Sequence, residues 1–266
     1  MSTSDVAFGT ELASAYATAA SGWAGGAGIV YARLAQALVH RLPTVDGELV
    51  LDLCAGTGAA TAPLLRRGCG VVAVDLAPAM LVVDRDLRPP GVAADAFALP
   101  FRPESFSAVV VACGLNHARD PTAFLAESGR VTRSGGVVLT STFAAGWNHP
   151  AKAAVDEALL PYGFRPPAWY ERFKQEVEPL TASENALRSL AASVGLRQPK
   201  VAREDVEVPA TVDQIVGWRF AMASHAGFIA GLSALDRRAA AEAAARNLTQ
   251  RWQPLVVPLL ILSGRV

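Results

Sequence analysis

Three aspartates follow the same pattern in this chain, because each lies at or near the end of an apolar stretch. Asp52 lies in "ELVLDL", Asp75 ends "GVVAVD" and Asp95 lies in "GVAADA". A carboxylate has two acceptor oxygens, which suit the hydroxyl pair of a ribose or an exocyclic amine of a nucleobase. Since parallel strands end at one edge of a sheet, the three acids are expected to meet there, around one ligand.

A glycine-containing turn follows Asp52 and ends at Gly58. Glycine permits positive φ and close approach of the backbone, and the helix that follows offers free N–H donors. A dinucleotide site would prefer three glycines and no carboxylate beside its pyrophosphate, but the three positions here hold Cys54, Gly56 and Ala59. The turn therefore favours a ligand with a cationic group, and a nicotinamide-dependent oxidoreductase is the less favoured alternative.

Regular alternation of apolar strands and amphipathic helices surrounds these acids. Asp120 and Pro121 have the residue types that begin a helix, here "DPTAFLAESGRV". The pattern predicts an α/β fold with a doubly wound, mostly parallel sheet and right-handed crossovers. Strands are expected at 48–53, 70–75, 91–96, 106–114 and 135–143, and helices at 59–67, 77–87 and 120–131.

The rhythm changes after residue 143, where aromatic and proline-rich helical pieces follow. A capping box from Thr181 to Glu184 is expected to start one helix, and Ser233 with Asp236 another, which carries an ion pair between Glu242 and Arg246. Residues 200–208 alternate like an edge strand, and 254–266 form a last apolar strand. We therefore expect N-terminal helices over the site (1–46), a core (47–143) and a remainder (144–266) with a helical cap inserted at about 144–180 and 210–252.

Composition and charge limit the partners. Lys+Arg and Asp+Glu both count 24, and no basic cluster occurs, which disfavours a nucleic-acid partner. No apolar run approaches the roughly 18 residues of a membrane span, and the N-terminus lacks the pattern of a signal peptide. We expect a cytoplasmic protein with a small-molecule partner, no membrane contact, no metal site and no disulfides among its three cysteines. A monomer and a homodimer both stay open.

Four segments in order resemble the successive motifs of class I S-adenosylmethionine-dependent methyltransferases. They are "VLDLCAGTG", "VVAVDLAPAML", "GVAADAFALPF" and "FSAVVVACGLNHARDPTAFLAESGRVTRSGGVVLTS". The resemblance is strongest to the small-molecule branch (UbiE-like, methyltransferase type 11), covers about 48–143 and implies a seven-stranded Rossmann-like sheet. Two departures stand out: Cys54 replaces the first glycine of the turn, and "TRSGG" replaces the family's Leu-Lys/Arg-Pro-Gly-Gly turn.

The resemblance implies S-adenosylmethionine as cofactor and a role for each matching residue. The methionine part would bind at Asp52 and the turn, the ribose at Asp75, and the adenine between Leu76 and Met80 with its amino edge at Asp95 and Ala96. The other implied cofactor residues are Ala55, Gly56 and Gly58 in the turn, Ala112 and Cys113 whose backbone faces the methionine amino group, and Tyr16, which would close over the cofactor.

The sulfonium is already activated, so such an enzyme mainly aligns a nucleophile and excludes water. A hydroxyl acceptor often needs a general base, whereas an amine or an enolate-like carbon needs little help. His117 is the first candidate base, with a plain helix-entry histidine as its alternative, and Asn116 is expected to orient the acceptor. The acceptor pocket is expected to include His149, Trp147, Trp218 and His225.

Few cations accompany these aromatic residues in the sequence, so a flat or apolar acceptor is expected rather than a polyanion. The predicted activity is O-, N- or C-methylation of a small organic molecule, with a secondary metabolite as one candidate. A family member that keeps the cofactor for another step, such as cyclisation, is an alternative. A nucleic-acid methyltransferase is disfavoured, because "CGLNHARDP" stands where an Asn/Asp-Pro-Pro-aromatic signature would lie.

Overall fold

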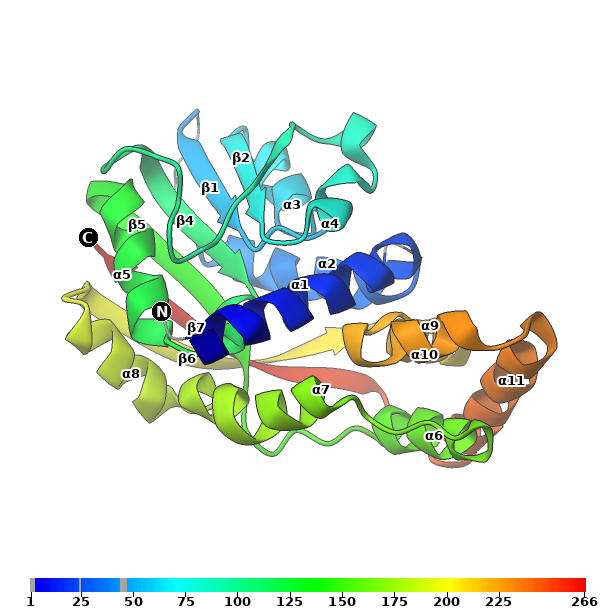
Figure 1. The fold of residues 1–266 in the computed structure, drawn as a ribbon. Helices are drawn as coiled ribbons and strands as arrows, with labels where there is room; N and C mark the ends of the chain where they lie inside the picture. Colours follow the sequence, from blue (N-terminus) through cyan, green and yellow to red (C-terminus); the bar gives the residue numbers. More distant parts are fainter. Residues whose placement is uncertain (1–2, 24, 44–46) are drawn as a thin grey trace.

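A seven-stranded sheet forms the centre of the computed structural model, which describes residues 3–23, 25–43 and 47–266. The strand order is β3-β2-β1-β4-β5-β7-β6 (Figure 1). Only β7 among these strands runs antiparallel to its neighbours, so the expected α/β fold with a mostly parallel sheet is confirmed. The strands are β1 (Leu49–Leu53), β2 (Gly70–Asp75), β3 (Gly91–Ala93), β4 (Phe106–Ala112), β5 (Thr132–Phe143), β6 (Arg197–Val208) and β7 (Leu255–Arg265).

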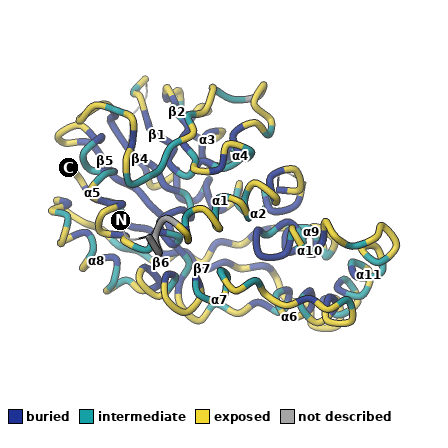
Figure 2. Tube along the Cα trace, viewed as in Figure 1, coloured by how far each residue is buried: buried dark blue, intermediate teal, exposed yellow. Residues whose placement is uncertain are grey.

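Helices cover both faces of the sheet. Successive side chains of a strand point to opposite faces, so Val50 shares a core cluster with α2 (Ala27–His40) and α3 (Thr61–Arg66). Its neighbour Leu51 shares the other cluster with α5 (Pro121–Val131) and α8 (Glu184–Ser193). Both faces are therefore buried, which explains why the central strands are continuous apolar runs (Figure 2).

A second group of helices, which we call the outer helices, packs together beyond β6 and β7 (Figure 1). These are α6 (Pro150–Leu159), α9 (Val212–Ala221), α10 (Ala223–Gly231) and α11 (Ala234–Gln250). Helix α1 (Thr3–Trp23) packs against α10 and α4 (Pro78–Val82), and so connects the outer helices to the sheet. The remaining short helices are α7 (Ala168–Arg172), a π-helix (Phe173–Val177) and 3₁₀ turns at Arg85–Leu87, Leu115–His117, Leu160–Tyr162 and Glu178–Thr181.

The expected division at residue 46 falls within residues 44–46, which lie outside the described residues. No helix within the described ranges is long and apolar enough to cross a membrane.

Helix α4 is shorter than the expected helix over 77–87. It ends at Val82, because Val83 is extended (φ −66°, ψ 130°) and Asp84 is left-handed (φ 51°). Arg88 explains how the chain tolerates this early end. Its Nη2 donates to the carbonyls of Met80 (2.9 Å) and Val83 (3.2 Å), satisfying acceptors that the helix leaves open.

Two local predictions in the C-terminal half were wrong. Ser183, not Thr181, begins α8: its Oγ accepts from the N–H of Ala186 (3.1 Å), whereas Thr181 is buried in the preceding 3₁₀ turn. Glu242 pairs with Arg238, one turn earlier, rather than with Arg246. Exposed ion pairs of this kind are worth little free energy, so spacing alone does not select between two equivalent partners.

Two other helix starts were predicted correctly. Asp120 accepts from the N–H of Ala123 (2.9 Å), and Ser233 accepts from the N–H of Asp236 (3.1 Å).

The "TRSGG" segment belongs to strand β5, which begins at Thr132 rather than at residue 135. The β4–β5 register shifts here, and Gly135 has a φ of +76°. A Cβ on Gly136 would lie 2.7 Å from the carbonyl oxygen of Ser107, so this position needs glycine. The two glycines thus make an irregular strand entry rather than a separate turn.

Candidate functional site

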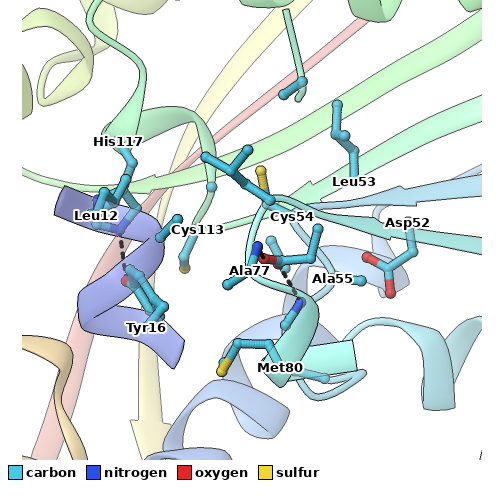
Figure 3. Close-up of a pocket in the computed structure, with 18 of the residues that line it drawn as sticks. Leu12, Tyr16, Asp52, Leu53, Cys54, Ala55, Ala77, Met80, Cys113 and His117 are labelled. Carbon is cyan, nitrogen blue, oxygen red and sulfur yellow. Dashed lines mark hydrogen bonds between the residues drawn. The ribbon is translucent and has the colours of Figure 1, made fainter. Parts of the chain in front are cut away.

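Asp52, Asp75 and Asp95 line one cleft at the carboxyl ends of β1, β2 and β3, as the sequence predicts. Figure 3 shows this cleft, with Asp52 labelled. About 1070 Å³ in this cleft is free of protein atoms, part of it open to solvent. Gly58 lies in the adjoining turn and is not among the lining residues. The other predicted cofactor residues all line the cleft: Tyr16, Ala55, Gly56, Leu76, Met80, Ala96, Ala112 and Cys113.

The turn after β1 is left-handed at three positions, with φ of 59° at Cys54, 54° at Gly56 and 92° at Gly58. Cys54 therefore holds a conformation that favours glycine, although it carries a side chain. Gly114, facing it, makes this possible: a Cβ there would lie 2.6 Å from Cβ and 2.9 Å from Sγ of Cys54. The departure from the family's turn is thus accommodated by a glycine on a different segment.

The carboxylate of Asp75 connects β2 to this turn. One oxygen accepts from the N–H of Gly56 (2.8 Å) and the other from the N–H of Ala77 (2.9 Å). Burial raises the pKa of Asp75, while these backbone bonds and the charge of Arg88 lower it in part. Each oxygen has a further lone pair, so the carboxylate can hold the turn and still accept from a ligand's hydroxyl groups.

Asp52 is completely buried, and one of its oxygens has no protein partner. Oδ2 accepts from the hydroxyl of Thr61 (2.5 Å), whereas Oδ1 makes no hydrogen bond. Burial raises the pKa of Asp52 to about 7, and the charge of Asp75 adds to the rise, against the opposing hydrogen bond from Thr61. An unpartnered buried acceptor is costly. It suits a ligand that brings a cation or a donor.

The remaining surface of the cleft is mostly apolar. Asp95 accepts from the N–H of Phe97 (3.0 Å), which fixes the turn after β3. Leu76, Met80 and Phe97 line the same region, and Phe124 meets Phe97 edge to face at 5.9 Å. Apolar side chains beside one carboxylate form a surface that can cover a flat ring and bind an exocyclic amine at its edge.

Arg88 is a charged neighbour of the site that the sequence analysis missed. Its Cδ would lie 3.0 Å from a Cβ on Gly58, so the side chain rests against the turn. Its charge acts on Asp52 and Asp75, and burial lowers its pKa. Nε and Nη1 are buried without a hydrogen-bond partner. Arg88 belongs to no motif, so only the fold brings it to the glycine turn.

His117 and Tyr16 form a hydrogen bond between Nε2 and the hydroxyl at 3.0 Å, shown dashed in Figure 3. The His117 ring also stacks on Phe173 at 4.9 Å. Burial lowers the pKa of His117 to about 4, and burial together with the charge of Asp75 raises the pKa of Tyr16. Both groups are therefore neutral at pH 7. Nδ1 of His117 is buried without a partner.

A second cavity, which we call the aromatic cavity, adjoins the cleft and shares Tyr16, Tyr31 and His117 with it. Asn116 lines this cavity, and its amide oxygen Oδ1 has no hydrogen-bond partner. The walls include the predicted residues Trp147 and Trp218, and also Phe143, Trp169, Tyr170 and Phe173. The expectation of few cations among these aromatic residues was wrong, because Lys152, Lys174 and Arg219 line the cavity as well.

Two of the predicted pocket histidines lie outside the lining of these cavities. His149 begins α6, where its Nδ1 accepts from the N–H of Ala151 (3.2 Å). His225 is buried behind Ser224, with Nε2 2.8 Å from Asp156 and Nδ1 2.9 Å from the Ser224 hydroxyl. These hydrogen bonds all lie within the outer helices.

Known proteins are similar to this chain mainly in the segment that contains the three aspartates. Residues 51–140 match a family described as a methyltransferase domain. A demethylmenaquinone methyltransferase from Renibacterium salmoninarum is 37% identical over 130 residues, 48% of this chain and 55% of that protein. A second, from Mycobacterium tuberculosis, is 39% identical over 114 residues, 43% of this chain and 49% of that protein. The chain thus spans about half the length of the curated relatives it matches.

Two solved structures extend the likeness to the fold of nearly the whole chain. A putative methyltransferase from an antibiotic biosynthesis pathway of Anabaena variabilis has a TM-score of 0.61 at 14% identity, covering 88% of this chain and 97% of that one. The 4+2 cyclase SpnF has a TM-score of 0.54 at 17% identity, covering 88% of this chain and 80% of that one. At these identities the likeness concerns the fold.

Proposed function

Because this chain belongs to the class I S-adenosylmethionine-dependent methyltransferases of the small-molecule branch, we propose that it transfers a methyl group from S-adenosylmethionine to a small organic acceptor. One observation carries the proposal: the cleft that contains the three aspartates and the aromatic cavity meet at Tyr16 and His117. A donor in the cleft and an acceptor in the cavity would face each other across this pair.

The residues of the cleft fit the cofactor's chemistry. Asp52, with its unpartnered Oδ1, would bind the methionine amino group, and Asp75 would accept from the ribose hydroxyls. Asp95 would meet the adenine amine, with Leu76 and Met80 on the faces of the ring. The cofactor, when bound, supplies an electrophilic methyl group, so the protein's task is alignment and the exclusion of water.

We assign His117 as the general base of this reaction for acceptors that must lose a proton. It is neutral at pH 7, and in the tautomer with the proton on Nε2, that N–H donates to the oxygen of Tyr16. Nδ1, which has no protein partner, then holds a free lone pair. In this role Tyr16 is a positioning residue. Asn116, whose Oδ1 is also unpartnered, would orient the acceptor by accepting its hydrogen bond.

Incubation with S-adenosylmethionine carrying an isotopic label on its methyl group tests the proposal. The acceptor panel should contain phenols, amines, β-dicarbonyls and a naphthoquinol, the last because the curated relatives are demethylmenaquinone methyltransferases. Mass spectrometry should detect the label on at least one acceptor, and His117→Ala should reduce its transfer to a hydroxyl. Binding of the cofactor without transfer to any acceptor would instead favour a member that keeps it for another step, such as cyclisation.

A further inference from the structure

The aromatic cavity has flat walls. Phe143 and Trp147 stack in parallel at 5.8 Å with an interplanar angle of 8°, and Trp147 and Trp218 stack at 6.1 Å and 29°. These rings contact one another and together form a flat aromatic face, on which a planar molecule can stack. His117 lines both this cavity and the cofactor cleft.

Two cations among the lining residues give this cavity a polar part. Lys152, half-buried, lies 4.0 Å above the ring of Trp147, and its Nζ donates to that residue's carbonyl at 2.7 Å. Arg219 is only 4% exposed and lines the same cavity. Long cations are seldom buried unless they are paired. Both positions therefore call for a counter-ion.

The protein supplies only part of that counter-charge. Arg219 Nη2 lies 3.4 Å from Asp156 Oδ1, but the same oxygen also lies 2.8 Å from His225. The third cation that lines the cavity, Lys174, pairs with Glu178. Lys152, Lys174 and Arg219 thus face two carboxylates, which leaves one positive charge in excess. Burial lowers the pKa of Lys152 to about 8, and the charges of Lys174 and Arg219 add to that effect.

Several polar atoms of this cavity have no hydrogen-bond partner. They are Nε of Arg219, Nε1 of Trp218, Oδ1 of Asn116 and Nδ1 of His117, all buried. The Arg219 and Trp218 atoms are donors, and a buried donor without a partner destabilises the protein. A ligand group that accepts hydrogen bonds would satisfy these two donors. An anion would do so best, since hydrogen bonds to a charged acceptor are about twice as strong as neutral ones.

We propose that the methyl acceptor is a planar aromatic acid, bound with its ring against this aromatic face and its carboxylate against Lys152 and Arg219. The ring then places its reacting group toward His117. This inference rests on the proposed function, because it names the acceptor class of that same site. It narrows the sequence-based expectation of a flat or apolar acceptor to a flat one that carries an acid.

Three naphthalene probes separate ring binding from charge recognition. They are 2-naphthoate, its neutral isostere 2-naphthamide, and the cation 2-naphthylmethylammonium. Each is titrated calorimetrically into the full chain at pH 7, once without and once with an excess of S-adenosylhomocysteine. We expect 2-naphthoate to bind about tenfold or more tightly than the amide, and the cation to bind most weakly. Equal affinity for naphthoate and naphthamide would overturn the proposal.

Two substitutions assign the charge recognition to these residues. Lys152→Met keeps the length of the side chain. It should weaken the binding of naphthoate about fivefold or more, while changing the affinity for naphthamide less than about twofold. Arg219→Gln should act in the same direction, with circular dichroism checking its fold. Lys200→Met, on the exposed edge strand β6, is the control and should change nothing. Equal weakening of both probes by Lys152→Met would mean that the lysine only supports packing.

A separate titration with S-adenosylhomocysteine distinguishes this inference from the proposed function. If the cofactor product binds but naphthoate is not preferred, the acceptor class is wrong and the methyltransferase proposal stands. If naphthoate is preferred and depends on Lys152 while the cofactor product does not bind, the anion site stands and the proposed function fails.

Discussion

The hydroxyl of Tyr16 and Nε2 of His117 are hydrogen-bonded at 3.0 Å although 101 residues separate them in sequence. Tyr16 comes from α1, near the N-terminus, and His117 from the turn that follows β4. The bond therefore joins the helix that covers the cofactor cleft to the sheet edge that forms it (Figure 3). It also orients the one imidazole that lines both cavities.

His117→Ala should lower turnover of a hydroxyl acceptor about 100-fold, because the general base is lost. Tyr16→Phe should lower it less, about tenfold, since the imidazole stays but loses its orienting partner. If Tyr16 acts through His117, the double variant should be no slower than His117→Ala alone. Saturation kinetics on one acceptor measures all three, with His40→Ala, at an exposed position, as the control. Normal turnover by His117→Ala would rule out the base.

Asp75→Ala should weaken binding of S-adenosylhomocysteine about 10- to 150-fold, a loss of about 1.4–3 kcal/mol. The ribose contacts are lost, and so are the bonds that hold Gly56 and Ala77. Turnover at saturating cofactor should be largely kept. Calorimetry on Asp75→Ala and on Asp86→Ala, an exposed acid nearby, provides the comparison. Unchanged affinity in the first variant would refute the ribose assignment.

Asp52 should make stability depend on pH. Its pKa rises from 3.8 in the unfolded chain to about 7 in the folded protein. The contribution of this carboxyl group to the free energy of unfolding is therefore fully present below pH 3.8 and is lost as pH rises through 7. The difference is worth up to about 4 kcal/mol. We expect the free energy of unfolding of Asp52→Asn, measured by urea titration, to rise relative to that of the parent between pH 4 and 7. Above pH 8 the difference between the two proteins should stay constant. A constant difference over the whole range would show that the carboxyl is not shifted.

Gly114 and Cys54 should be energetically coupled. Gly114→Ala should destabilise the fold, because the added methyl meets Cβ of Cys54 at 2.6 Å. Cys54→Gly removes that obstacle and suits the left-handed backbone, so it should recover part of the loss, although Val111 Cγ1 at 2.9 Å remains. We expect a coupling free energy of about 0.5–3 kcal/mol in a double-mutant cycle by urea unfolding. Additive effects would mean that the two residues do not share this space.

Periodicity and helix-start signals were sufficient to predict most of the sheet and the helices beside it. Strand β4 and helix α5 show this best, since a continuous apolar run and the Asp120-Pro121 start leave few alternatives. Helix α4 was overestimated because its end depends on Arg88, which reaches back to Met80 and Val83 through tertiary contact. Such a contact leaves no periodic signal in the sequence.

The cofactor cleft was more predictable than the acceptor cavity. Asp52, Asp75 and Asp95 all follow apolar strands, and the topology of a parallel sheet brings such ends together. Lys152 and Arg219 lie on different outer helices, α6 and α9, and nothing in their spacing indicates that they share a wall. His149 and His225 were expected in the pocket by residue type, but the structure gives them partners within the outer helices.

The identity of the cofactor is the central claim, and a ligand-dependent shift in stability tests it most directly. The parent protein is unfolded by urea or heat with S-adenosylmethionine, S-adenosylhomocysteine or NAD, each in large excess. Either sulfur compound at 100 times its dissociation constant should add about 2.7 kcal/mol to the free energy of unfolding, and NAD should add nothing. Stabilisation by NAD with none from S-adenosylmethionine or S-adenosylhomocysteine would contradict the account.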